Sequence, residues 1–366
     1  MTWFHRFLQA VFLVASVATP QALADPVGSV ANNFHVQRLA DGVYAVIRQD
    51  PPGMMCDGNS GFIVGDDGVI VVDAPEASRE VLAAIRKVTK KPVTAVINTH
   101  WHDDHIIGNQ VYRNAFPKAR FIAHEATREY LAGPGVEARQ RMIDYAPRGV
   151  DQLQGFLASG VGPDRSPLNA EERASLESDV LLVEHYLEVA KAAIVLPTEV
   201  VRDSMTLRQR SREIRIFYLG RGHTSGDLVV WLPRERILFS GDLVVWPIPL
   251  VGADQSHVGS WSATLDAMRG LHPQTIVPGH GPIQADDSYA ALLSRLFASV
   301  KEQVETPALE GKSLAEIRKF VDLSEFRNKL VGDSKVRSTL FEMYVEGPAV
   351  ESAYRDATSN KADLLH

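Results

Sequence analysis

The segment at residues 99–105 reads Thr-His-Trp-His-Asp-Asp-His, with three histidines and two carboxylates in seven positions. Imidazole nitrogens and carboxylate oxygens are ligands that zinc prefers and that iron and manganese also accept. His100 and His102 face the same way on an extended segment, so they can bind one ion together. Asp104 and His105 follow at the start of a predicted helix, where they can face a second ion. The segment therefore predicts a site for two metal ions.

Three motifs further along the chain share this design, because in each a metal-type residue follows a predicted strand. They contain His223, Asp242 and His280, each beside a glycine that permits a tight turn. Strand ends are rigid supports, and the loops after them can turn side chains into a common cleft. One such motif would be a weak signal, but four in order favour a shared metal site.

The pattern around these motifs predicts alternating strands and helices. Short apolar runs between turn residues predict strands at residues 43–48, 60–64, 69–72, 93–97, 120–123, 214–219, 228–232, 237–240 and 275–277. Helical periodicity covers residues 76–88, 260–271 and 288–305. Each metal-type segment therefore begins just after a strand.

Residues 126–200 interrupt this pattern. Two long helices are predicted, Val136–Ala158 and Ala170–Ala193, with a loop rich in Gly, Pro and Ser between them. A helical insertion between metal motifs can be a lid over the site, or a scaffold element or dimer contact, and the sequence leaves both open. The tail, residues 311–357, is predicted to be wholly helical.

The first residues resemble an export signal. A short basic start ends at Arg6, an apolar stretch covers Phe7–Val17, and Ala22–Ala24 supplies a small-x-small cleavage pattern. The apolar stretch is too short for a permanent membrane helix. We therefore expect residues 1–24 to be removed and the mature protein to be periplasmic or secreted, with no stable membrane anchoring.

Composition excludes some classes of function. The chain has 366 residues, 45% of them hydrophobic, and a formal net charge of −7. This balance argues against nucleic-acid binding, which needs clustered Lys and Arg, and favours a small-molecule substrate. Cys56 is the single cysteine, so no internal disulfide can form, and we expect it to be a small packing residue. The oligomeric state is not indicated.

Taken together, the motifs resemble those of the metallo-β-lactamase superfamily. Asp73 carries the first family motif and residues 100–105 the second, and His223, Asp242 and His280 carry the remaining three. The resemblance implies an α+β fold, a four-layer αββα sandwich of the metallo-β-lactamase type with a dinuclear site at one edge. We expect this domain at residues 30–300, with the helical insertion inside it and a C-terminal helical extension at residues 301–366.

The resemblance also implies a complete ligand set for two zinc ions per chain, with iron or manganese as alternatives. The ligands to the first ion would be His100, His102 and His223, and those to the second would be Asp104, His105 and His280. Asp242 would bridge the two ions. Asp73 would steady the ligand loop without binding an ion itself.

Such a site predicts hydrolysis. Two divalent ions about 3.5–4 Å apart lower the pKa of a shared water towards neutrality, which yields a hydroxide nucleophile. One ion polarises a carbonyl or phosphoryl oxygen, and the other stabilises the departing anion. Asp104 can also orient the hydroxide, so Asp104 and Asp242 are the candidate catalytic residues.

The substrate is less defined. β-Lactamases of this family usually have Cys or Ser in place of the bridging Asp242, with a Lys or Ser nearby to hold the drug's carboxylate, and Leu243–Trp246 offers neither. The sequence therefore predicts an exported dizinc hydrolase of a small acyl compound: a β-lactam, lactone, ester or thioester. The alternatives are an iron-dependent oxidoreductase or persulfide dioxygenase on the same fold, a glyoxalase II-like thioesterase, and a non-catalytic binding protein.

Overall fold

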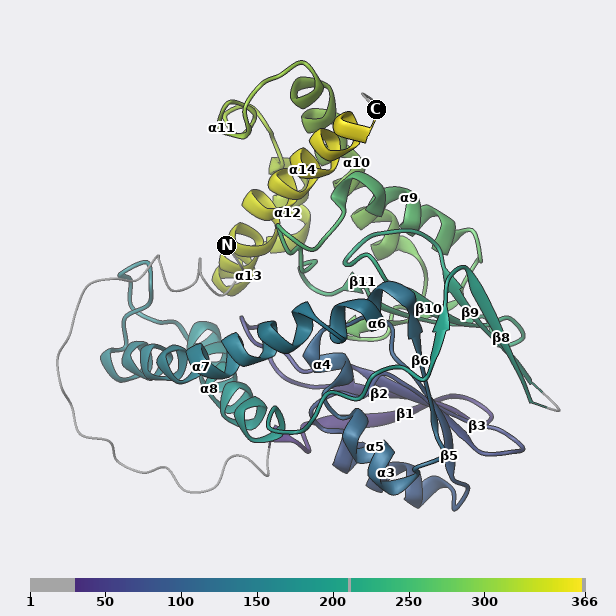
Figure 1. The fold of residues 1–366 in the computed structure, drawn as a ribbon. Helices are drawn as coiled ribbons and strands as arrows, with labels where there is room; N and C mark the ends of the chain where they lie inside the picture. The colour runs from purple at the N-terminus through teal and green to yellow at the C-terminus, as the bar shows by residue number, and fades with distance from the viewer. Residues whose placement is uncertain (1–29, 210–211, 364–366) are drawn as a thin grey trace.

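Two β-sheets lie face to face in the structure, a computed structural model that describes residues 30–209 and 212–363 (Figure 1). The first has seven strands in chain order: β1 (Phe34–Ala40), β2 (Val43–Arg48), β3 (Ser60–Val64), β4 (Val69–Val72), β5 (Val93–Ile97), β6 (Arg120–His124) and β7 (Glu199–Val201). The second has the order β12 (Thr275–His280), β11 (Ile237–Val245), β10 (Leu228–Leu232), β9 (Arg212–Tyr218) and β8 (Ser204–Gln209). The predicted export signal lies outside the described residues.

Helices cover the outer face of each sheet. On the seven-stranded sheet these are α3 (Ser78–Val88) and α5 (Asn109–Ala115), and on the five-stranded sheet they are α9 (Val258–Arg269) and α10 (Ser288–Leu309). The short helix α4 (Asp103–Ile106) begins within the histidine-rich segment. The four layers confirm the predicted αββα sandwich.

Alternation along the strands explains the layering. In β10, the side chains of Leu228, Val230 and Leu232 pack between the two sheets, while Val229 and Trp231 face the helices α9 and α10. Successive residues of a strand point to opposite faces, so a continuous apolar run is buried on both sides. This is why the central strands could be predicted from apolar runs alone.

The insertion consists of α6 (Glu125–Leu131), α7 (Pro134–Ser159) and α8 (Ala170–Val189). Helices α7 and α8 share a hydrophobic cluster of their own, against which Met54 and Met55 also pack. The Asp179 carboxylate of α8 accepts hydrogen bonds from the backbone N–H groups of Met54, at 3.1 Å, and Met55, at 2.8 Å. The insertion is therefore joined to the loop that precedes β3.

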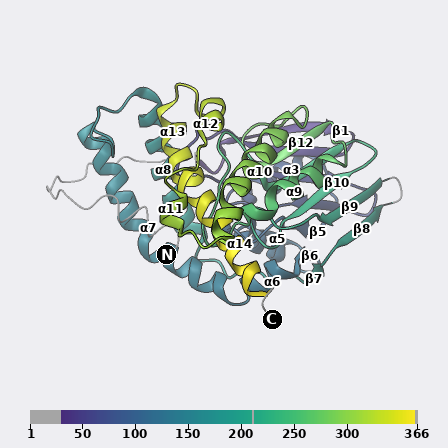
Figure 2. The same cartoon turned by 90° about the horizontal axis from the view of Figure 1, so that it is seen from above.

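The tail is helical but broken into α11 (Leu314–Ile317), α12 (Ser324–Val331), α13 (Lys335–Phe341), a π-helical turn (Glu342–Glu346) and α14 (Gly347–Asp363). The expected boundary at residue 301 falls inside α10, which continues to Leu309. Phe341 and Val345 share a hydrophobic core with Trp261 of α9. Figure 2 shows α14 alongside α10. The tail is thus packed onto the sandwich.

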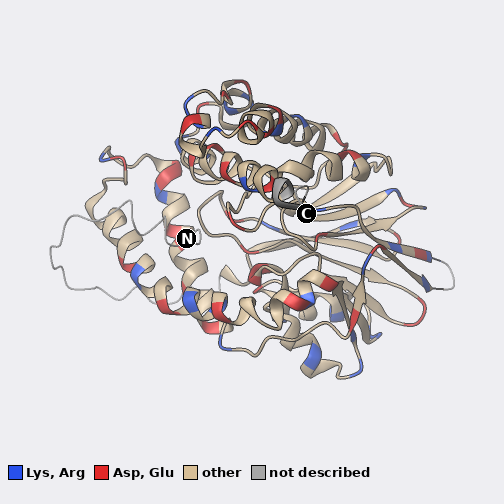
Figure 3. Ribbon diagram, turned by 45° about the horizontal axis from the view of Figure 1, so that its top comes forward, with Lys and Arg blue, Asp and Glu red and all other residues tan. Residues whose placement is uncertain are grey.

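Over the described residues, acidic and basic positions are interspersed along the outer helices and strand ends (Figure 3). None of the helices described in the structure has the length and apolar character needed to cross a bilayer.

Candidate metal centre

All seven predicted ligands come together where strands of both sheets end. His100 and His102 lie in the loop after β5, and Asp104 and His105 begin helix α4. From the second sheet, His223 lies between β9 and β10, Asp242 lies within β11, and His280 ends β12. Their ligand atoms fall into overlapping groups in which all atoms lie within 4.8 Å of one another.

The first group contains His100, His102, His223 and Asp242. His102 Nδ1 lies 3.1 Å from His100 Nε2 and 2.8 Å from His223 Nε2. Asp242 Oδ2 lies 3.7 Å from His100 Nε2 and 3.4 Å from His223 Nε2. A tetrahedral zinc ion with bonds of about 2.0–2.1 Å separates its ligand atoms by roughly 3.3 Å. The donor set and spacing therefore fit one ion.

The second group contains His105, Asp242 and His280, and a third group contains Cys56, Asp104 and His280. His105 Nε2 lies 3.2 Å from His280 Nε2 and 3.2 Å from Asp242 Oδ1. Asp104 Oδ2 lies 3.1 Å from His280 Nε2. Asp242 thus belongs to the first and the second group. Its Oδ1 atom is buried and accepts no hydrogen bond among the described residues, which fits an oxygen that binds a cation.

Two histidines are held by hydrogen bonds on the side away from the groups. His223 Nδ1 donates to the Leu250 carbonyl at 2.8 Å, which leaves Nε2 as the unprotonated atom. His102 Nε2 donates to Gln255 Oε1 at 2.9 Å, which leaves Nδ1. Outer partners of this kind fix the tautomer and the ring orientation of metal-binding histidines.

The charge states also suit metal binding. Burial lowers the pKa of His223 to about 3 and lowers that of His100 well below its usual value, so both imidazoles are neutral. Burial raises the pKa of Asp242, but the histidines around it, His280 first, lower it more, so it is ionised. For His105 and His280, burial lowers the pKa, but the anionic groups beside them, Asp242 for His105 and Cys56 followed by Asp242 for His280, raise it well above the usual value. Because neutral imidazole and ionised carboxylate are the forms that bind a cation, a cation at these two rings would displace their protons.

A glycine keeps the space beside Asp242 open. A Cβ atom at Gly279 would lie 1.8 Å from Asp242 Oδ1. No side chain can be accommodated there unless the carboxylate moves, because real Cβ contacts are far longer. Gly279, the residue before His280, must therefore be a glycine if the Asp242 carboxylate is to stay between the two groups of histidines.

Asp73 holds the ligand loop through hydrogen bonds to Thr99 and a contact with His105. Its carboxylate accepts hydrogen bonds from the Thr99 backbone N–H at 2.7 Å and the Thr99 hydroxyl at 2.8 Å, and it lies 3.0 Å from His105 Nδ1. Its backbone has a φ of 58°, a left-handed conformation that Asp and Asn tolerate best after glycine.

We expect Asp73→Asn to weaken binding of a zinc ion at the group that contains His105 by about 10–100-fold, because His105 loses its anionic partner while the backbone conformation is kept. Competition with a chromophoric chelator measures this affinity. An unchanged affinity would show that His105 is oriented without Asp73.

Asp103, next to Asp104, points away from the metal-type groups. Arg139 of α7 binds the Asp103 carboxylate through Nε, 3.0 Å from each oxygen, and through Nη2. The Tyr186 hydroxyl of α8 donates to the same carboxylate at 2.8 Å. Asp103 therefore connects the insertion to the ligand loop. Neither Arg139 nor Tyr186 belongs to a motif that could be recognised in the sequence.

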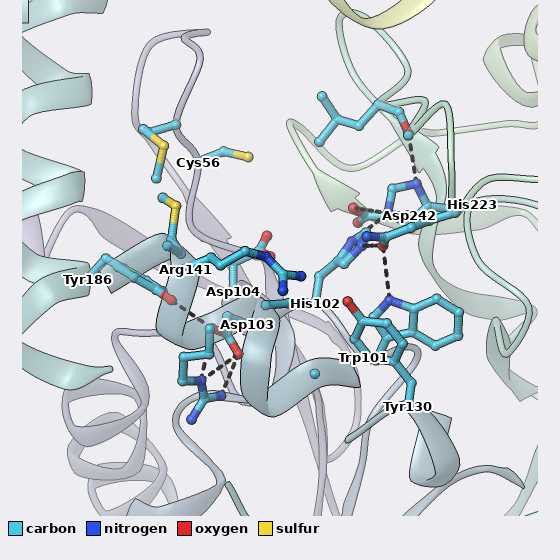
Figure 4. Close-up of a pocket in the computed structure, with 18 of the residues that line it drawn as sticks. Cys56, Trp101, His102, Asp103, Asp104, Tyr130, Arg141, Tyr186, His223 and Asp242 are labelled. Carbon is cyan, nitrogen blue, oxygen red and sulfur yellow. Dashed lines mark hydrogen bonds and ion pairs between the residues drawn. The ribbon is translucent and has the colours of Figure 1, made fainter. Parts of the chain in front are cut away.

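A cavity of about 310 Å³ opens onto the ligands (Figure 4). Its lining is largely apolar and includes Met55, Trp101, Tyr130, Met142 and Tyr145. The Trp101 ring stacks on Tyr130, with ring centroids 4.5 Å apart. Since α7 contributes several of these residues, the insertion forms one wall of the cavity.

The expectation that Cys56 is a packing residue is wrong. Cys56 is partly exposed and lines the cavity, with Sγ 4.0 Å from His280 Nε2. It lies in an irregular loop before β3, where no periodicity indicates which way a side chain faces.

The chain is similar to known proteins of one family, in sequence and in fold. A model of the metallo-beta-lactamase superfamily matches residues 53–280. The chain is 26% identical to a linear primary-alkylsulfatase of Pseudomonas sp. over 60% of its own length, but the match spans only 40% of that enzyme. It is 23% identical to a type 2 metallo-beta-lactamase of Bacteroides fragilis, over 75% of this chain and 90% of that one.

A solved metallo-beta-lactamase from Pontibacter korlensis has the same fold, with a TM-score of 0.50 and 17% identity over 72% of this chain and 99% of that one. The family match covers more than half of the chain and includes every candidate ligand. This protein belongs to the metallo-β-lactamase superfamily.

Proposed function

We propose that this protein is an exported dizinc hydrolase that cleaves a small acyl substrate: a β-lactam, lactone, ester or thioester. The observation that carries the proposal is the pair of donor groups that share Asp242. His100, His102 and His223 would hold one ion, Asp104, His105 and His280 the other, and Asp242 both. When bound, two zinc ions supply Lewis acidity and a water of lowered pKa.

The side chains around the ions then have separate tasks. Asp104 is the ligand with the most open carboxylate, 21% exposed, so its free oxygen can accept a proton from a water in the cavity and orient it. Burial lowers the pKa values of His100 and His223, so these two rings stay neutral. The apolar lining excludes bulk water and leaves room for a substrate body beside the ligands.

A sulfate ester of an aliphatic alcohol is a second candidate substrate. The apolar lining suits an alkyl chain, and one relative carries the name of a linear primary-alkylsulfatase. Two alternatives can be told apart from this proposal by experiment. An iron-dependent oxidoreductase would contain iron and take up oxygen, and a glyoxalase II-like thioesterase would cleave the thioesters of a substrate panel.

A substrate panel tests this proposal. We expect the purified protein, stripped by a chelator and reloaded with zinc, to hydrolyse at least one member of a panel of β-lactams, lactones, thioesters, carboxylic esters and alkyl sulfates. Activity should vanish with the chelator and return with zinc. His102→Ala should abolish it, whereas His35→Ala, a change of the same type on the exposed strand β1, should not.

Zinc-loaded protein that turns over no member of the panel would contradict the proposal and favour a binding function. Export is tested separately, by N-terminal sequencing of protein secreted from its host. We expect a chain that begins near Asp25, and a cell-bound chain that keeps residues 1–24 would contradict export.

A further inference from the structure

We infer that the substrate carries an anionic group beside an apolar body, and that Arg141 of α7 binds this anion. The inference rests on the proposed function, because it concerns the substrate of the same site. Arg141 lines the cavity together with His102 and Asp104, and its side chain extends from α7 into the space in front of them (Figure 4).

The apolar part of the cavity is built for a flat or flexible hydrophobic group. Trp101 and Tyr130 form a stacked aromatic pair, and Met55 and Met142 add flexible side chains. Methionine adapts its shape to irregular apolar surfaces, and aromatic rings offer broad ones. A fully polar substrate would make no apolar contacts with these side chains.

Two arginines line the cavity, and their surroundings differ. Arg139 is 7% exposed, and its guanidinium is bound to the Asp103 carboxylate and the Ala192 carbonyl. Arg141 is 47% exposed, and its ion pair with Glu137, at 3.6 Å, is with a side chain that is itself 80% exposed. An exposed pair of this kind is easily exchanged for a stronger one. Arg141 is therefore the arginine able to receive a ligand anion.

Four of the five carboxylates that line the cavity have other partners or surroundings. Asp104 and Asp242 belong to the metal-type groups, and Asp103 is paired with Arg139. Glu76 is buried and lies 3.1 Å from His185 Nδ1, and burial raises the pKa of its carboxyl well above the usual value. Asp254 remains as the carboxylate that opposes an anion, on the loop between β11 and α9.

The residues directly after Asp242, which end β11 and begin the following loop, supply no competing cation. Residues 243–246 are Leu, Val, Val and Trp. Arg337 lies over the Trp246 ring, 4.8 Å from its centroid, and is not part of the cavity lining. Since the residues after Asp242 offer no cation, Arg141 of the helical insertion is the side chain that would bind the anion. Helix α7 would then take part in substrate binding.

A pair of fluorescent probes tests the anion site without relying on turnover. 8-Anilinonaphthalene-1-sulfonate carries a sulfonate, and N-phenyl-1-naphthylamine has the same aromatic body without it. We expect Arg141→Met to weaken binding of the sulfonate probe about tenfold, as for loss of a charge-assisted hydrogen bond, and to change the neutral probe less than about twofold. Arg148→Met, on the exposed surface of the same helix, should change neither, and Asp254→Asn should tighten sulfonate binding.

Unchanged sulfonate binding in Arg141→Met, or equal loss for both probes, would overturn the inference. A second measurement uses 4-nitrophenyl hexanoate and mono(4-nitrophenyl) adipate, esters of equal chain length that differ by a carboxylate. We expect Arg141→Met to raise KM for the adipate ester selectively, with kcat nearly unchanged. If zinc-loaded wild type hydrolyses neither ester nor any compound of the wider panel, the proposed function fails, while the probe result still decides the anion site.

Discussion

Asp242→Ala is expected to lower zinc content below one ion per chain and to reduce hydrolysis by about 10³-fold or more. Asp242 is the residue whose oxygens approach both groups of histidines, Oδ2 at 3.4 Å from His223 and Oδ1 at 3.2 Å from His105. In the proposed two-ion site, its loss would remove a ligand from each ion and the negative charge that balances them. Elemental analysis and turnover of the same preparation check both results.

Two further variants test whether the effect of Asp242→Ala comes from the loss of this particular carboxylate. Asp242→Asn keeps the size of the side chain and one coordinating oxygen, so it should retain more zinc than Asp242→Ala while remaining impaired. Asp286→Ala, which removes an exposed carboxylate, should match wild type. A fully active Asp242→Ala would rule out a shared ligand at this position.

Arg139→Met is expected to lower the free energy of unfolding by about 3–5 kcal/mol, because it leaves Asp103 without its buried cationic partner. The Asp103 carboxylate would keep the Tyr186 hydroxyl, at 2.8 Å, as its neutral partner. Since Asp103 precedes Asp104 in the ligand loop, zinc affinity should fall as well. Chemical denaturation and chelator competition measure the two effects.

The matched control is Arg120→Met. Arg120 also forms a two-pronged contact, with Glu199, but the side chains are 44% and 37% exposed. An exposed pair contributes only about 0.2–1 kcal/mol, so the control should be close to wild type. Equal losses in the two variants would show that the Asp103–Arg139 contact does not hold the insertion in place.

The strands that the sequence analysis missed share one physical property. β1, β7 and β8 are all edge strands, and they were not predicted. β1 has four exposed residues among its seven, and β8 has one buried side chain, Leu207. Edge strands are stabilised by pairing with a neighbour on one side, so their own residues carry little apolar signal. Central strands such as β2 and β3 are buried on both faces and were predicted to the residue.

The candidate site divides in a similar way. The candidate ligand positions, whose metal binding stays a prediction, could be named because those at residues 100–105 are local in sequence and each remaining candidate lies beside a glycine in or next to an apolar run. The contacts that support them could not, since Gln255 lies 153 positions from His102 and Asp103 lies 36 from Arg139. These two contacts form only when the insertion and the loops pack against the sandwich. Neither Gln255 nor Arg139 belongs to a motif that could be recognised in the sequence.

The most direct test of the dizinc centre is native mass spectrometry of the wild-type protein, with elemental analysis of the same sample. We expect two zinc ions per chain, falling in His102→Ala and in Asp242→Ala but not in His35→Ala. A wild-type chain that binds no metal, or whose metal content is unchanged in both ligand variants, would contradict the assignment of these side chains as a two-ion site.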